Sequence, residues 1–243
     1  MANRILYNIA FAPPEDRVQE YQEFLENVKR ADTEVKVVAL ERTSLGLNFR
    51  YYLALVLPDI LHIIKKAEQE GYDAAIIGCF NDPGLQVAKE MANIVVTAPA
   101  EASLHIAATL GQKFSIIVGE ADSIPPVMEN VISYGLKDKL ASFRSIGLRA
   151  SELRKDEEET AHRIRQAARE ALEQDLAEVI ILGCTVLYGF SREIQKNLGV
   201  PVIDPVVAAF KYAELLIELK KRFHWWHSER VGFEHPPKDR ILT

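Results

Sequence analysis

The sequence predicts an α/β fold whose two halves repeat the same alternation of strands and helices. Apolar runs of strand length alternate with amphipathic segments of helix length along the chain. Two of the runs, residues 75–79 (AIIGC) and 180–184 (IILGC), are near copies, and each ends in one of the chain's two cysteines. A proline follows each cysteine at almost the same spacing, at Pro99 and Pro205. This rhythm is typical of parallel sheets covered by helices.

In the first half, the ends of the helices are marked by residues with known preferences. Pro58 suits the first turn of a helix, and Gly71 suits a C-terminal cap. Asp82 followed by Pro83 is typical of an N-cap and the first helical position. We therefore expect strands at 5–10, 34–40, 74–78 and 94–98, and helices at 16–30, 58–71 and from 82 to about 93.

The second half repeats this cycle. Gly111 is expected to close one helix, while Ser191 caps another and Gly199 ends it. The segment 156–174 is charged on nearly all sides, which predicts a helix with a solvent-exposed outer face. We expect strands at 114–119, 143–148, 178–183 and 200–203, and helices at 102–110, 126–134, 156–174, 191–197 and 206–223.

Composition and charge narrow the class of protein. An apolar content of 48% and a charged content of 26% are ordinary for a globular chain that can bury a large core. The net charge of −6 gives no reason to expect nucleic acid or an anionic membrane as a partner. The chain enters a strand without an apolar leader, and two distant cysteines are no disulfide framework. We expect a reduced, cytoplasmic protein with a small-molecule substrate.

The two cysteines are the strongest candidates for chemistry. Each follows a predicted parallel strand, and ligands bind at the carboxyl ends of such strands. We expect the helix starting near Asp82 to present its positive end to Cys79 and to favour the thiolate. One thiolate could then remove a proton beside a carbonyl while the other thiol returns a proton to the opposite face. Such an inversion needs no metal and no organic cofactor.

Other interpretations of the cysteines remain open. Free cysteine is among the most buried residue types and often acts as a small apolar filler. No C-x-x-C redox motif is present, and the six histidines show no metal-ligand spacing with either cysteine. The motif of residues 224–227 (HWWH) could bind a metal or stack on a ring. A docked tail or a subunit contact fits it better.

Several segments together resemble one known family. Residues 71–85 (GYDAAIIGCFNDPGL) resemble the hydantoin racemase branch of the aspartate/glutamate racemase superfamily. Residues 100–103 (AEAS) with 110–115 (LGQKFS) are similar to its next block. Residues 182–185 (LGCT) and 199–204 (GVPVID) are similar to its second cysteine block.

The resemblance implies two pseudo-symmetric lobes, each with a mostly parallel four-stranded sheet flanked by helices, and an active site between the lobes. Lobe one would consist of residues 1–98 plus 206–243 and hold Cys79. Lobe two would consist of residues 99–205 and hold Cys184. By resemblance these cysteines are the two acid/base residues, the substrate is a hydantoin-like ring such as allantoin, and the chain assembles into a homo-oligomer.

The loops that would line the pocket depart from the family pattern. Of the usual Asn-Pro-Asn-Ser/Thr loop only Asn8 survives, and the stretch 43–52 lacks the usual Gly-Pro. Residues 185–190 (TVLYGF) are bulkier than the small residues of the hydantoin branch. Aromatic residues here fit either an apolar substituent on the substrate or core packing. We expect substrate contacts from Asn8, Phe11, Phe49, Asn81, Asp82, Glu101, Ser103, Thr185 and Tyr188.

Two other functions compete with racemisation. The altered loops leave open a cysteine-dependent isomerase or decarboxylase of the same superfamily, with one cysteine as nucleophile or proton donor. Fold alone also permits a small-molecule binding or thiol-sensing protein without catalysis. A decarboxylase of this type uses a single cysteine, so the presence of two favours proton transfer from both faces.

Overall fold

The computed structural model describes residues 2–41, 47 and 49–236, and its strands form two separate four-stranded sheets. The first sheet has the order β2-β1-β3-β4, and every pair in it is parallel. Its strands are short apolar runs buried on both faces at the centre, as expected for a parallel sheet covered by helices. They are β1 (Asn3–Ile9), β2 (Thr33–Ala39), β3 (Ala74–Gly78) and β4 (Val95–Thr97).

The second sheet repeats the order of the first. It runs β6-β5-β7-β8, again with parallel pairs only, so β3 and β7 hold equivalent positions. Its strands are β5 (Phe114–Val118), β6 (Leu140–Ser145), β7 (Val179–Leu182) and β8 (Val202–Ile203). The predicted α/β fold with two pseudo-symmetric parallel sheets is confirmed.

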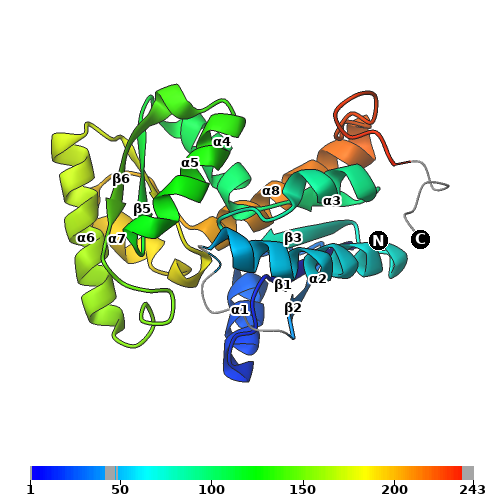
Figure 1. Ribbon diagram of the computed structural model, residues 1–243, viewed down its shortest axis with the longest axis horizontal. Helices are drawn as coiled ribbons and strands as arrows, with labels where there is room; N and C mark the ends of the chain where they lie inside the picture. The colour runs from blue at the N-terminus through cyan, green and yellow to red at the C-terminus, as the bar shows by residue number, and fades with distance from the viewer. Residues whose placement is uncertain (1, 42–46, 48, 237–243) are drawn as a thin grey trace.

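Helices cover both sheets, which lie in the two halves of the molecule seen in Figure 1. Right-handed parallel connections place successive helices on the sheet faces. The helices are α1 (Glu15–Val28), α2 (Arg50–Gln69), α3 (Leu85–Met91), α4 (Pro99–Leu110), α5 (Ile124–Ser133), α6 (Glu157–Gln174), α7 (Ser191–Leu198) and α8 (Pro205–Phe223). Short 3₁₀ turns lie at 121–123, 137–139 and 185–187.

The predicted bounds of α2 and β6 are wrong for identifiable reasons. Helix α2 begins at Arg50 and carries Pro58 inside it, because a continuous apolar face from Val56 to Ile64 is buried and offsets the proline. Strand β6 spans Leu140–Ser145 rather than 143–148. It ends where Gly147 takes a positive φ of 68° and turns the chain.

Helices α4 and α8 join the two halves. Helix α8 packs on β1, β3 and β4, α4 packs on β7, and the two helices pack against each other. One apolar core therefore includes Ile76 of the first sheet, Ile181 of the second and Phe210 of α8. The lobe boundaries at 98/99 and 205/206 stay a prediction, and Met1 and 237–243 of lobe one lie outside the described residues.

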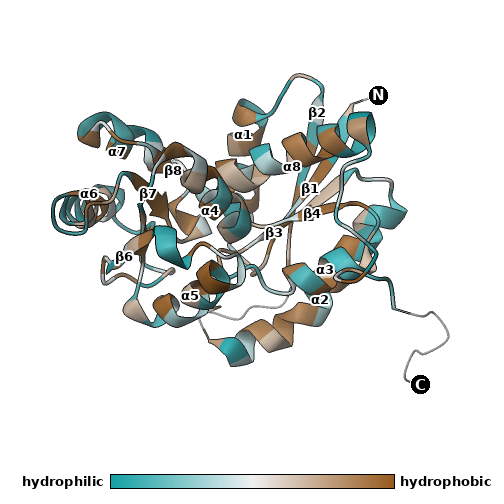
Figure 2. Ribbon diagram, turned by 90° about the horizontal axis from the view of Figure 1, so that it is seen from above, coloured by the Kyte–Doolittle hydropathy of each residue, from teal (hydrophilic) through white to brown (hydrophobic). Residues whose placement is uncertain are grey.

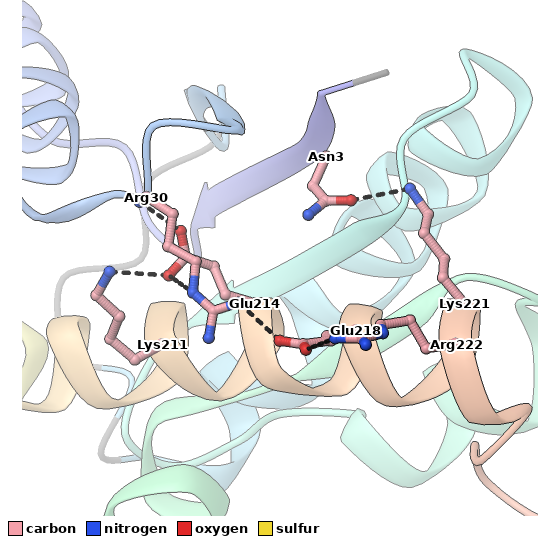
Figure 3. A network of polar contacts seen from close by, with 7 residues as sticks. All are labelled: Asn3, Arg30, Lys211, Glu214, Glu218, Lys221 and Arg222. Carbon is pink, nitrogen blue, oxygen red and sulfur yellow. Dashed lines mark hydrogen bonds and ion pairs between the residues drawn. The ribbon is translucent and has the colours of Figure 1, made fainter.

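The buried carboxylate of Glu214 on α8 binds the turn between α1 and β2 in the first half (Figure 3). Glu214 is fully buried and accepts hydrogen bonds from the backbone N–H of Arg30 and from Lys211 Nζ, both at 2.8 Å. Arg30 also reaches Glu218 at 3.0 Å, and Lys221 donates to Asn3 Oδ1 at 2.9 Å. Because Arg30 follows α1, these contacts fix the α1–β2 turn to the joining helix.

The helices on the outside are amphipathic. Helix α6 buries a stripe that includes Ile164, Ala168 and Ala171 and turns its charged residues outward, as expected from its sequence. In Figure 2 this helix lies at the edge of the molecule and is largely hydrophilic in colour. Among the helices that the structure describes, none is long and apolar enough to cross a membrane.

Candidate active site

The glycine before each cysteine lets the central strand of each sheet pass close to its neighbour. A Cβ on Gly78 would lie 2.6 Å from the backbone oxygen of Asn8 and 2.7 Å from the Tyr7 ring. A Cβ on Gly183 would lie 2.8 Å from Ile116 Cγ2 and 3.0 Å from the backbone oxygen of Ile117. Only glycine avoids these contacts, so the Gly-Cys pair in each repeat has a structural cause.

The two strand ends meet across the halves of the molecule. Thr185 Oγ1 donates to the backbone oxygen of Gly78 at 3.4 Å, so the residue after Cys184 touches the residue before Cys79. Tyr21 of α1 donates to the backbone oxygen of Thr185 at 2.8 Å. These buried contacts bring together residues that are 107 and 164 positions apart in the chain.

Burial dominates the ionisation of both thiols. It raises the pKa of Cys79 to about 12; the Asn81 amide opposes this rise, while the charge of Cys184 and then that of Asp82 add to it. Burial also raises the pKa of Cys184, against the backbone amide of Val186, the charge of Arg154 and the backbone amide of Leu187. The charge of Cys184 acts on Cys79, so the two thiols lie within electrostatic reach of each other.

The expected helix start at Asp82 is wrong. Helix α3 begins at Leu85 after Gly84 and has only 7 residues, so its positive end does not begin beside Cys79. Asp82 has a positive φ of 49° and instead accepts the N–H groups of Ala100 and Glu101 at 2.9 and 2.7 Å. The carboxylate that follows Cys79 therefore caps α4, the helix that leads into the second half.

Asp82 is held in a buried hydrogen-bonded position. Tyr134, the C-cap residue of α5, donates to its Oδ2 at 2.7 Å, in addition to the two backbone groups of α4. Burial raises the pKa of Asp82 to about 7, although these hydrogen bonds favour its charged form. This carboxyl therefore links the Cys79 loop, α4 and α5, and it changes charge near neutral pH.

Two buried polar side chains of β1 lack partners. Among the residues that the structure describes, no hydrogen-bond partner is found for the Asn8 amide or for the Tyr7 hydroxyl. Both residues are fully buried, and Asn8 lies opposite Ile77 on β3, close to Cys79. Burial raises the pKa of Tyr7, and the charges of Tyr21, Asp204, Cys79 and Cys184 add to this effect. The Tyr7 hydroxyl thus lies within electrostatic reach of both thiols, and unpaired buried polar groups of this kind are candidates for binding a ligand.

Other predicted contacts lie at the rim of this region. Asn81 donates through Nδ2 to the backbone oxygen of Leu47 at 2.7 Å. The Tyr188 ring packs against Tyr21, with 4.2 Å between the ring centroids, and its hydroxyl donates to Glu20 at 3.0 Å. Asn81 and Tyr188 lie in the loops that follow Cys79 and Cys184, and these contacts hold their side chains in place.

For four of the predicted substrate-contacting residues, the structure shows where the side chain lies in the protein. Glu101 pairs with Lys89 of α3, and Phe11 is partly buried against the main core. Ser103 is fully buried in α4, and no partner for its hydroxyl is found among the described residues. The Phe49 ring is 53% exposed and packs edge-on against Tyr52. Of the loop at 43–52, residues 43–46 and 48 lie outside the described residues.

Sequence reasoning missed Tyr7, Tyr21 and Arg154. In the sequence the two tyrosines are typical of buried aromatic residues on a strand and a helix. Arg154 lies in a charged turn before α6. Only tertiary packing brings them to the cysteines, so no local pattern marked them. In the described part of the chain, no three His, Cys, Asp or Glu side chains are grouped to hold a metal ion.

Comparisons with known proteins agree with this architecture. The family model described as Asp/Glu/Hydantoin racemase matches residues 19–213. The chain is 34% identical over 214 residues to a hydantoin racemase of Pseudomonas sp. (strain NS671), covering 88% of this chain and 84% of the relative. It is 38% identical over 172 residues to a hydantoin racemase of Paenarthrobacter aurescens, covering 68% and 71%.

A solved structure agrees as well. The allantoin racemase from Klebsiella pneumoniae superposes with a TM-score of 0.91 at 25% identity, covering 100% of this chain and 97% of that one. The family model, the relatives and the solved structure together define an isomerase of the racemase class. The chain belongs to the Asp/Glu/Hydantoin racemase family.

Proposed function

We propose that the protein racemises or epimerises a hydantoin-like carbon acid, either a 5-substituted hydantoin or allantoin, using Cys79 and Cys184 as two bases. The observation that carries this proposal is the pair of thiols at equivalent sheet ends, where the Cys184 charge acts on Cys79 and both thiols act on the Tyr7 hydroxyl. The names of the relatives, hydantoin racemase and allantoin racemase, support the class of substrate.

The chemistry requires one thiolate and one thiol. The thiolate takes the proton from the carbon beside a ring carbonyl, and the electron pair of that bond passes onto the carbonyl oxygen. The second thiol then donates its proton to the opposite face of the flat carbon, which inverts the centre. After each turnover the former thiolate carries the proton and the former thiol is a thiolate. The product enantiomer is therefore bound beside the reversed protonation state of the two sulfurs.

Polar groups around the thiols suit a cyclic ureide. Such a ring presents carbonyl acceptors and N–H donors in one plane. The Asn8 amide offers both a donor and an acceptor, and Tyr7 offers a hydroxyl, all buried and unpaired in the described structure. Backbone N–H groups of Asn81 and Val186 lie at the two sulfurs and favour negative charge there.

Proton exchange with solvent tests the proposal directly. A single enantiomer of a 5-substituted hydantoin, and separately of allantoin, is incubated with the protein in D₂O. We expect the optical rotation to decay while deuterium enters the chiral carbon, because the returned proton comes from a solvent-exchanged thiol. Rotation and the mass of the product are followed together, with the protein-free reaction as the control for spontaneous racemisation.

Other outcomes would replace the proposal. Release of carbon dioxide from a malonate-type acid, or isomerisation of an alkene, with no exchange on hydantoins would assign the alternative cysteine chemistry. Binding of hydantoins without exchange would assign a non-catalytic role. Either result contradicts racemisation.

A further inference from the structure

Arg154 lies directly behind the loop that carries Cys184. Its Nε donates to the backbone oxygen of Val186 at 2.9 Å, and its Nη2 donates to that of Tyr188. The guanidinium also lies over the rings of Tyr188 and Phe190, 4.3 and 4.7 Å from their centroids. Only 15% of the side chain is exposed, so this cation is held in a fixed place.

The segment that Arg154 holds is the one whose amides face the sulfur. The backbone N–H groups of Val186 and Leu187 both favour the Cys184 thiolate, and the Arg154 charge acts in the same direction. Cys79, Tyr7 and Tyr21 also lie within electrostatic reach of Cys184, and none of them is cationic. Arg154 in turn pairs with Glu157 at 2.8 Å and lies within electrostatic reach of the buried Asp204. Arg154 is therefore the cation identified beside this thiol.

The equivalent loop after Cys79 is held by neutral groups and carries an acid. Asn81 donates to the backbone oxygen of Leu47 at 2.7 Å, and Asn130 donates to the backbone oxygen of Asn81 at 3.0 Å. One backbone amide faces the Cys79 sulfur, and the neighbouring Asp82 charge opposes a thiolate there. The two halves thus repeat the fold but differ in the charge that acts on each thiol: Asp82 on Cys79, and Arg154, which is itself paired with Glu157 at 2.8 Å, on Cys184.

We infer that Arg154 is a positioning residue that makes the pair asymmetric, so that Cys184 is the thiolate and Cys79 the thiol in the ligand-free protein. The inference rests on the proposed function for its catalytic meaning. The enantiomer whose C–H bond faces Cys184 then binds to a protein in which the Cys184 thiolate is already formed. The opposite enantiomer requires the proton to move from Cys79 to Cys184 first.

The pH dependence of alkylation at each cysteine tests this assignment. The full-length protein is treated with limiting iodoacetamide across a pH series, and initial rates at Cys79 and Cys184 are separated by peptide mass spectrometry. Arg154→Gln removes the charge but keeps amide donors, whereas Arg154→Lys keeps the charge. Arg163→Gln is the matched control, because Arg163 also binds a backbone oxygen of the second half, that of Ile146, away from the thiols.

We expect the inflection at Cys184 to lie at lower pH than that at Cys79 in the unmodified chain. Arg154→Gln should move the Cys184 inflection up by about one pH unit, which is about tenfold slower alkylation below it, and leave Cys79 unchanged. Arg154→Lys should retain most of the wild-type profile, and Arg163→Gln all of it.

An earlier inflection at Cys79, or an Arg154→Gln variant that shifts both cysteines equally or neither, would overturn the inference. The order of the inflections in the unmodified chain decides the matter even if Arg154→Gln does not fold. Alkylation does not depend on turnover. A protein that shows the expected profile but exchanges no hydantoin proton would therefore contradict the proposed function and leave the asymmetry standing.

Discussion

At the residue scale, the glycines before the cysteines set how closely the strands of the site can approach. The space at Gly78 is filled on one side by backbone and on the other by the Tyr7 ring. A backbone oxygen cannot move aside as a flexible side chain can. The absence of a side chain at Gly78 therefore allows the strand that leads to Cys79 to lie against the Tyr7 ring.

Gly78→Ala should destabilise the fold. The added methyl meets the Asn8 backbone oxygen and the Tyr7 ring at under 3 Å, which forces a shift in β1 costing about 1–3 kcal/mol. The midpoint of urea unfolding measures this cost. Gly232→Ala is the control, since a Cβ there meets no atom within 4 Å. A Gly78→Ala variant as stable as the wild type would show that the strands are not in close contact here.

At this scale, the sequence predicts the two proposed bases and little of their surroundings. The repeated Gly-Cys pair identifies Cys79 and Cys184 because a short local pattern records a close approach of strands. Tyr7 and Arg154 lie on other elements, so their closeness to the cysteines depends on tertiary packing that no local spacing encodes. The expected helix dipole at Cys79 is wrong for the same reason, because Asp82 makes its hydrogen bonds with α4.

At the element scale, the start of α4 depends on a residue outside that helix. Ala98 at the N-cap position provides no side-chain acceptor, and Asp82 from the Cys79 loop supplies it. Helix α8, at the equivalent place, is capped by its own Asp204, which accepts from Val206 and Val207. The two joining helices therefore begin alike in sequence but differ in where the cap comes from.

Asp82→Asn should flatten the dependence of stability on pH. Burial raises the folded-state pKa of Asp82 to about 7, well above the value near 4 in the unfolded chain. Below pH 4 the carboxyl is protonated in both states, and its contribution to the free energy of unfolding is fully present. The folded protein loses this contribution as pH rises through 7. Asparagine cannot ionise, so the variant keeps a more constant stability over this window.

Melting temperatures at pH 5 and pH 8 measure this effect. The wild type should lose more stability between the two values than Asp82→Asn. Asp156→Asn is the matched control, because Asp156 caps α6 from an exposed position through Glu159, and it should retain the wild-type pH difference. An equal drop in wild type and Asp82→Asn would contradict a buried, neutralising carboxyl at the start of α4.

At the scale of the whole molecule, alternating strands and helices were enough to predict both sheets and the equivalence of β3 and β7. That pattern reflects burial of parallel strands on both faces, which is encoded locally. How the halves meet was not predictable. The contacts of Thr185 with Gly78 and of Tyr21 with Thr185 join residues more than a hundred positions apart.

Two bases working from opposite faces require both halves of the molecule to contribute one thiol. Cys79→Ser and Cys184→Ser separate these contributions, since serine keeps the size of the side chain and loses the accessible thiolate. Deuterium exchange is measured for each variant with each pure enantiomer of the substrate, beside the rate of racemisation.

Each variant should lose racemisation by about 10²-fold or more, because inversion needs both faces. The remaining cysteine should still exchange the proton of one enantiomer, and the favoured enantiomer should be opposite in the two variants. Racemisation at the wild-type rate in either variant would show that one cysteine suffices and would contradict the two-base scheme.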